Sequence, residues 1–178
     1  ARKRKDRMPP GHPVHLKDIH LERGMHCTDC HFEQDVHGDG KLYGEVRNAI
    51  EIDCIDCHGT VSTLADLKKT SGPAGGNSLL ASQTPFDTSR FYWKGDQLMQ
   101  RSATDRKTEW EVPQVFDSVN DPTDPRYNKR AARAKLIQKD GKRLSGGLLS
   151  ETLADASCPK NLAHDNSNMT CYACHTSW

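Results

Sequence analysis

The pentapeptide Cys-x-x-Cys-His occurs three times in this chain of 178 residues, at residues 27–31, 54–58 and 171–175. In each copy two residues separate the two thiols, and a histidine follows the second thiol directly. The chain holds only 9 histidines. Chance would place one after all three cysteine pairs about once in ten thousand sequences of this composition. The three copies therefore indicate one shared chemistry.

That spacing is typical of the attachment site of a c-type haem. Each sulfur forms a thioether with one porphyrin vinyl group, and the adjacent histidine lies under the ring and donates a nitrogen to iron. We therefore expect three covalently bound haem c groups, each holding one iron. The attaching cysteines are Cys27, Cys30, Cys54, Cys57, Cys171 and Cys174, and the proximal ligands are His31, His58 and His175.

Two other uses of paired cysteines have to be weighed. The pairs Cys27/Cys30 and Cys54/Cys57 match the spacing of a zinc ribbon, and a CxxC pair can also close a disulfide. Neither alternative explains the three adjacent histidines, and zinc leaves the pair at residues 171–174 without a partner pair. Haem is the better explanation.

An electron-transfer haem usually has a second protein ligand, most often histidine or methionine. His20 and His164 each lie seven residues before the first cysteine of a motif, and Met25 and Met169 each lie two residues before it. This is an internal repeat. The second motif has Arg47 at the position that matches the upstream histidine, so its distal ligand has to come from another part of the chain.

We expect His20, His37 and His164 to be the distal ligands, with His15 and His12 as the next candidates. His26 abuts the first motif, which limits its reach to another iron. The two repeat methionines are expected to pack against porphyrin faces rather than to ligate iron.

The composition supplies little apolar material for an ordinary core. Hydrophobic residues make up 34% of the chain and aromatic residues 6%, and the mean hydropathy is −0.81. Burial of apolar surface must still offset the conformational entropy lost on folding. We therefore expect the haems to form the core, and no stable fold without them. The net charge is +1, and we expect no nucleic-acid partner.

No stretch is long and apolar enough to span a membrane. Because c-type haem is installed outside the cytoplasm, we expect an exported protein, periplasmic or extracellular. The sequence does not begin with methionine and is expected to be a mature or trimmed product. Six of the 7 cysteines belong to the three motifs, and Cys158 does not. A buried thiol is expected there, with an intermolecular disulfide as the alternative.

The chain is expected to form one unit organised by its haems, in three parts. Residues 1–62 carry two haem sites, residues 63–157 carry none, and residues 158–178 carry the third. Within the middle part we predict a β-meander, with strands around a Gly95-Asp96 turn and at residues 108–112. A helix over residues 126–139 and a flexible loop or linker at residues 71–78 complete it. The fold class is a multihaem cytochrome c, mostly coil and short helices wrapped around a three-haem core.

Segments 24–32, 52–60 and 169–178, together with residues 91–112, resemble parts of large bacterial multihaem c-type cytochromes. Only the haem motifs are specific in this resemblance. Such proteins tend to be longer, so the chain is expected to be a processed piece or a short relative. The resemblance implies an exported electron-transfer protein, and some such cytochromes polymerise into filaments that conduct along stacked haems.

The expected function is electron transfer through three bis-histidine haems, to redox partner proteins or extracellular acceptors, without chemistry on a substrate. The third motif lies near the last residue of the chain, and several non-motif histidines lie near the first residue. This arrangement would let one subunit ligate iron in the next. Such a head-to-tail contact does not close and gives a fibre. The alternative is a multihaem reductase of a small nitrogen or sulfur oxyanion, which needs an open iron. Multihaem nitrite reductases often carry a CxxCK motif, and none occurs here.

Overall fold

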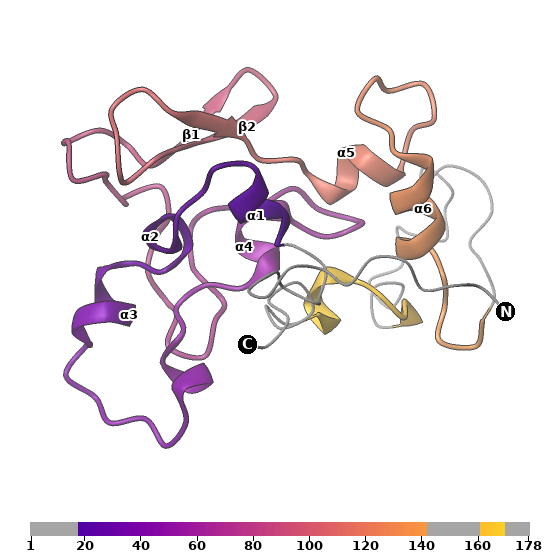
Figure 1. Cartoon of the computed structure of the whole chain (residues 1–178). Coiled ribbons are helices and arrows are strands. Elements are labelled where there is room, and N and C mark those ends of the chain that lie inside the picture. The colour runs from indigo at the N-terminus through magenta and orange to yellow at the C-terminus, as the bar shows by residue number, and fades with distance from the viewer. Residues whose placement is uncertain (1–17, 142–160, 170–178) are drawn as a thin grey trace, which may run out of the picture.

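The computed structural model of the chain describes residues 18–141 and 161–169 (Figure 1). Its helices are short, and in the described ranges the longest has 7 residues. None of the helices described there has the length and apolar content to cross a membrane. They are α1 (Ile19–Glu22), α2 (Cys27–Cys30), α3 (Glu33–His37), η1 (Val46–Ala49), α4 (Cys54–His58), α5 (Val115–Val119), α6 (Lys129–Lys135) and η2 (Asn166–Asn168).

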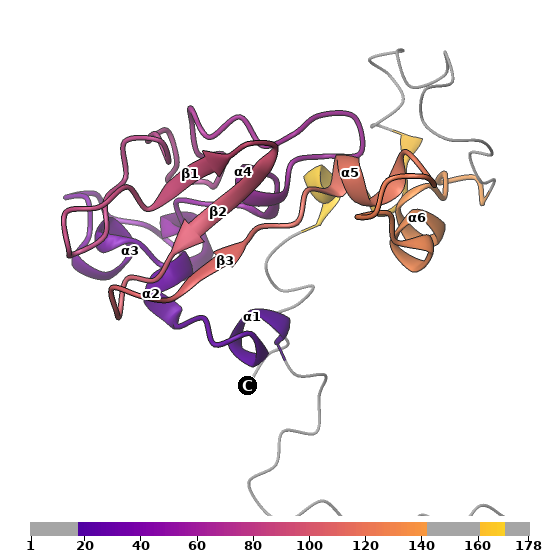
Figure 2. The same ribbon diagram turned by 90° about the horizontal axis from the view of Figure 1, so that it is seen from above.

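The predicted β-meander is confirmed. Strands β1 (Phe91–Lys94), β2 (Gln97–Arg101) and β3 (Glu109–Glu111) form one antiparallel sheet in the order β1-β2-β3. Gly95 adopts φ 64° at the turn between β1 and β2, a left-handed conformation that glycine takes without steric cost. Figure 2 shows the three strands side by side, with α2 and α4 close to the sheet and α5 and α6 beyond the end of β3.

The helix predicted over residues 126–139 is shorter than expected at both ends. Asn128 starts α6, because its side-chain oxygen accepts hydrogen bonds from the N–H groups of Arg130 and Ala131. The residues before it form a separate turn, in which the Arg126 N–H donates to the Asp124 carboxylate at 2.7 Å. Local side-chain hydrogen bonds therefore compete successfully with the helix here.

The end of α6 is set by a distant segment. Beyond Leu136, the Ile137 carbonyl accepts a hydrogen bond from the Ala163 N–H at 2.8 Å, and the Lys139 N–H donates to the Asn161 carbonyl at 2.8 Å. Residues 137–139 are thus extended against residues 161–163. The sequence pattern could not reveal this pairing, because its partner lies far along the chain.

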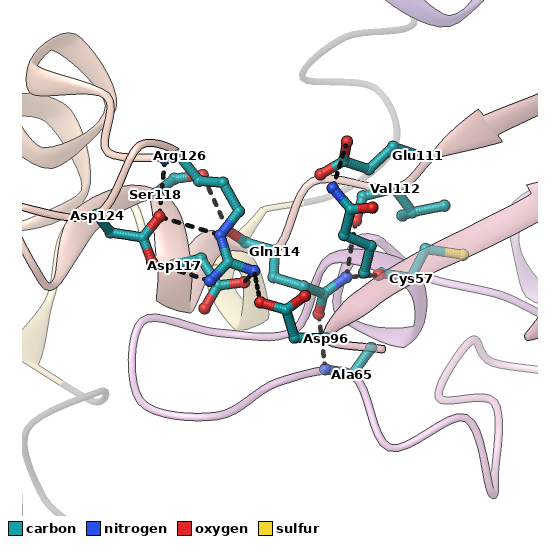
Figure 3. A network of polar contacts seen from close by, with 11 residues as sticks. Cys57, Ala65, Asp96, Glu111, Val112, Gln114, Asp117, Ser118, Asp124 and Arg126 are labelled. Carbon is teal, nitrogen blue, oxygen red and sulfur yellow. Dashed lines mark hydrogen bonds and ion pairs between the residues drawn. The ribbon is translucent and has the colours of Figure 1, made fainter. Parts of the chain in front are cut away.

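A guanidinium joins three parts of the middle segment. Arg126 lies 3.0 Å from the Asp96 carboxylate in the β1–β2 turn and 3.0 Å from that of Asp117 in α5. It also lies 2.8 Å from the Asp124 carboxylate in its own turn. Figure 3 shows the three carboxylates around the one cation. The sheet and α5 are therefore linked by an ion-pair network rather than by a shared apolar face.

Apolar packing in the described part is divided between two small clusters. The sheet cluster contains Phe32, Ala65, Leu67, Leu79, Phe91, Leu98 and Val112. The helix cluster contains Val61, Val119, Ala132, Leu136 and Leu162. α5, which no pattern in the sequence predicted, contributes Val119 to the second cluster. The clusters fit the low apolar content of the chain; a haem core remains a prediction.

Residues 71–78, predicted as a flexible loop or linker, form a loop that packs against residues 50–51. The Gly72 N–H donates to the Glu51 carbonyl at 3.0 Å, and the Ala74 N–H donates to the Ile50 carbonyl at 3.0 Å. A Cβ at Gly72 would come within 2.5 Å of the Glu51 carbonyl oxygen. Glycine here permits the close approach of two backbone segments.

Candidate haem-binding site

The two CxxCH motifs in the described part of the chain form the same helical turn. In α2, the His26 N–H donates to the Asp29 carboxylate at 2.8 Å. In α4, the Asp53 N–H donates to the Asp56 carboxylate at 2.8 Å. Both aspartates precede the second cysteine of their motif. Each carboxylate therefore closes the first turn of its own helix, where backbone donors lack helical partners.

The same two aspartates anchor the motifs to distant loops. Asp29, 1% exposed, accepts a second hydrogen bond from the Ala103 N–H at 2.7 Å. Asp56, 7% exposed, accepts one from the Ser71 N–H at 2.9 Å. Buried carboxylates need such donors to offset lost solvation. The third motif has Ala173 at this position and has no carboxylate for such an anchor.

Gln100 in β2 and Arg90, just before β1, bind the backbone of the first motif. The Gln100 side-chain amide of β2 donates to the Asp29 carbonyl at 2.6 Å, and the Arg90 guanidinium donates to the Thr28 carbonyl. Arg90 also lies over the Phe32 ring, 4.4 Å from its centroid. Burial lowers the pKa of Arg90, and the negative charge of Asp29 opposes that shift. The middle segment thus supports the first motif directly.

Gln114, which follows β3, holds the second motif. Its amide nitrogen donates to the Cys57 carbonyl at 2.9 Å and to the Val112 carbonyl at 3.0 Å. Its amide oxygen accepts from the Ala65 N–H at 2.9 Å. Figure 3 shows this side chain between the end of the motif and the following loop. The three hydrogen bonds of the buried amide therefore connect the Cys57 carbonyl with the backbone of Val112 and Ala65.

The chain leaves the second motif through Gly59, which adopts φ 62°. A Cβ at this position would come within 2.8 Å of the Ala65 nitrogen, so the tight turn requires glycine. The Gly59 carbonyl accepts a hydrogen bond from the Asn166 side chain at 3.1 Å. The Met169 sulfur lies 3.0 Å from the Lys135 ammonium. The segment that precedes the third motif therefore returns to the end of the second motif.

Both motif histidines in the described part use Nδ1 in a hydrogen bond. His31 Nδ1 lies 3.2 Å from the Asp35 carboxylate, and His58 Nδ1 lies 2.8 Å from the Pro113 carbonyl. Neither oxygen acceptor carries a proton to donate, so Nδ1 is the donor in both pairs. Burial lowers the pKa of His58, which outweighs the opposite effect of the Pro113 bond. The neutral imidazole that iron requires is thus favoured.

His20, the predicted distal ligand upstream of the first motif, lies beside the second motif. The centroids of the His20 and His58 rings are 6.0 Å apart, and the ring planes are inclined by 39°. With metal–nitrogen bonds of about 2 Å, two imidazoles on opposite sides of one metal ion have ring centres about 6 Å apart. His20 Nδ1 also bonds a carboxylate, that of Asp18, at 3.2 Å. The spacing of the pair suits two axial ligands of one iron.

The other predicted residues are not brought to a described motif histidine. His37 ends α3 and is exposed, His164 is exposed in the loop before η2, and His26 is exposed at the start of α2. Met25 is partly buried. The residues that lie outside the described ranges are His12, His15, Cys158, Cys171, Cys174 and His175.

The donor set fits a covalently bound haem better than zinc. Cys27, Cys30, Cys54 and Cys57 are not joined in disulfides, and each pair lies on one helical turn. With Nδ1 engaged, each of the three histidines has Nε2 to offer a metal, and among the described residues no hydrogen bond engages it. Within those residues no three Cys, His, Asp or Glu side chains gather as a metal site.

Several residues of the site were not predicted from the sequence. The aspartate before the second cysteine recurs in two motifs, at Asp29 and Asp56, and this recurrence was a usable signal. Asp35 lies four residues beyond His31, a spacing that brings side chains together on a helix. Pro113 and Gln114 gave no signal, because they meet the second motif only through the path of the chain after β3.

Comparisons of the chain with protein-family models, with characterised proteins and with solved structures gave no match. The site is therefore interpreted from its own residues.

Proposed function

We propose that the chain is a multihaem c-type cytochrome that transfers electrons through three covalently attached haems. The observation that carries the proposal is the 6.0 Å separation of the His20 and His58 rings, which suits two axial ligands of one iron. An iron with two histidine ligands has no open position for a substrate, and this favours electron transfer over a reductase. Bound haem supplies a one-electron iron couple.

The residues of the chain have distinct tasks in this proposal. The cysteines of each motif hold the porphyrin, and the histidine that follows them ligates iron. Asp29, Asp56 and Gln114 fix the backbone of the motifs through buried hydrogen bonds. A rigid ligand environment limits rearrangement when iron changes oxidation state. The middle segment serves as the support on which the motifs are mounted.

The arrangement of the motifs supports a connected set of haems. α1 precedes the first motif and carries His20 to the second. η2 precedes the third motif and contacts the backbone at Gly59, next to the second. Both flanking units thus converge on α4. A haem on α4 would be the intermediate carrier between the other two.

Expression in a host that installs c-type haem tests the proposal. We expect three haems per chain by the pyridine haemochrome assay, low-spin ferric signals in electron paramagnetic resonance and no carbon monoxide binding after reduction. A product without a Soret band would overturn the proposal. Haem that is high-spin and binds carbon monoxide would instead favour the reductase.

Export and head-to-tail assembly remain predictions. Electron microscopy of the secreted holoprotein tests the assembly: filaments are expected if a histidine of one subunit ligates iron of the next. A monomer in size-exclusion chromatography with all three irons six-coordinate would contradict ligand sharing.

A further inference from the structure

We propose that Asp35 sets the reduction potential of the first haem, by accepting a hydrogen bond from the iron ligand His31. The inference rests on the proposed function, because it concerns the iron that His31 would ligate. It assigns Asp35 a role that the CxxCH motif does not contain.

The contact is well defined. His31 Nδ1 lies 3.2 Å from one oxygen of Asp35, and the other oxygen accepts from the Glu51 N–H at 3.1 Å. The Asp35 side chain is 5% exposed, whereas that of His31 is 43% exposed. The Glu51 backbone, on a second segment of the chain, therefore holds the Asp35 carboxylate beside the His31 ring. The carboxylate cannot turn away from Nδ1 without breaking the bond to Glu51.

The local fold explains why these residues meet. His31 follows α2 as its C-cap residue, and Asp35 lies in the middle of α3. Between them Phe32 is buried in the sheet cluster, where its ring packs edge-on against that of Phe91 at 6.4 Å between centroids. Burial of Phe32 fixes the angle between the two short helices. It thereby fixes the carboxylate relative to the imidazole.

The acceptor on the second motif is of a different kind. His58 Nδ1 donates to the neutral Pro113 carbonyl at 2.8 Å. A hydrogen bond to a carboxylate is roughly twice as strong as one to a neutral acceptor. It shifts electron density into the imidazole and makes Nε2 a better donor to iron. The imidazoles of His31 and His58 would therefore differ in how strongly each donates to iron.

A stronger nitrogen donor stabilises ferric iron more than ferrous iron and lowers the potential. The electron for the step comes from the redox partner, or from an electrode in the test. No bond forms or breaks, and the Nδ1 proton stays on His31. Asp35 acts through His31 and is a positioning and tuning residue.

The test compares two variants of the holoprotein. Asp35→Asn replaces the charged acceptor by an amide of the same shape. Asp39→Asn removes the same charge from a nearby exposed loop, where Asp39 contacts Tyr43 and Lys41 rather than a histidine. All three reduction potentials are measured by spectroelectrochemical titration in each protein.

In Asp35→Asn we expect one of the three potentials to rise and the other two to stay unchanged. The expected rise is about tenfold in the one-electron equilibrium constant, or about 59 mV. In Asp39→Asn all three should stay unchanged. Three unchanged potentials in Asp35→Asn, or an equal shift in Asp39→Asn, would overturn the inference.

A measurement on the wild-type protein covers the case in which Asp35→Asn fails to fold. In the fully reduced, diamagnetic holoprotein, a scalar coupling across the hydrogen bond should connect His31 Nδ1 with the Asp35 carboxylate. Absence of this coupling would contradict the role of Asp35. A chain that takes up no haem would overturn the proposed function instead, so the two failures are distinguishable.

Discussion

The imidazole of His20 in α1 and that of His58 in α4 lie 6.0 Å apart, centroid to centroid. His20 Nδ1 donates to the Asp18 carboxylate, and His58 Nδ1 donates to the Pro113 carbonyl. The upstream unit of one motif is thereby joined to the proximal ligand of the next. In the proposed function, this pairing would supply the ligand that the second motif lacks in its own upstream segment.

Replacement of His20 by alanine should open one iron. We expect about one third of the haem to become high-spin in the ferric state and to bind carbon monoxide when reduced, because one of three irons loses its distal nitrogen. Electron paramagnetic resonance and carbon monoxide difference spectra measure this. The matched control is His26→Ala, because His26 is exposed at the start of α2 and its ring is not placed beside that of His58. Equal spectra for the two variants would contradict the pairing.

The buried carboxylate of the first motif should be important for stability. Asp29→Ala leaves the N–H groups of His26 and Ala103 without their acceptor. Each lost partner costs about 1–3 kcal/mol where water cannot replace it. We expect a loss of about 2–4 kcal/mol in chemical denaturation of the holoprotein.

The exposed Asp66, which accepts only from the Lys68 N–H at 2.9 Å, provides the control. Asp66→Ala should change the free energy of unfolding by less than about 0.5 kcal/mol. A similar loss in both variants would show that the contacts of Asp29 have no special weight.

The amide of Gln114 should be difficult to replace by an apolar side chain of similar size. Gln114→Leu removes the donor to the Cys57 carbonyl and the acceptor of the Ala65 N–H, both at 2.9 Å. Because Gln114 is 4% exposed, water does not take over these bonds, and we expect a loss of about 2–5 kcal/mol.

Thermal unfolding of Gln114→Leu and of Gln97→Leu, followed by far-ultraviolet circular dichroism, makes the comparison. Gln97 has a single side-chain hydrogen bond, to the exposed Glu111 at 3.4 Å. We expect its replacement to shift the unfolding midpoint little. A larger shift for Gln97→Leu would be incompatible with the support we assign to Gln114.

Stability should depend on acid pH through Asp124. The hydrogen bonds from Arg126 lower the pKa of this carboxyl from 3.8 to about 2. A carboxyl whose pKa is lower in the folded state contributes stability above pH 3.8, and loses it as the pH falls toward 2. The difference in unfolding midpoint between wild type and Asp124→Asn should therefore be constant above about pH 5 and shrink below pH 4.

Arg126→Gln provides the reference background for this measurement. Because the Arg126 side chain is the largest cause of the lowered pKa of Asp124, the pH-dependent part of the difference should become smaller when both proteins carry Arg126→Gln; the Arg126 backbone N–H still donates to Asp124. A difference that persists unchanged in that background would assign the effect to another group. Added salt should weaken it, because the pairs lie near the surface.

The local parts of the fold could be predicted from the sequence. The strands around Gly95-Asp96 follow from a turn that matches their twist, and this information lies within a few neighbouring residues. The bounds of α6 could not be predicted, because the Asn128 cap and the pairing of residues 137–139 with residues 161–163 override a stretch of good helix formers. Propensity is a weak preference that such contacts exceed.

The sequence alone identified the chemical groups of the candidate site, but it did not show how they are arranged in space. The three CxxCH motifs alone determine which atoms can hold a porphyrin and which nitrogen follows them. Only the tertiary structure places Pro113 and Gln114 against the second motif, Asp35 behind His31, and His20 beside His58. Most of these contacts join segments that share no local pattern. Long-range burial and hydrogen bonding decide them, and spacing along the chain does not record them.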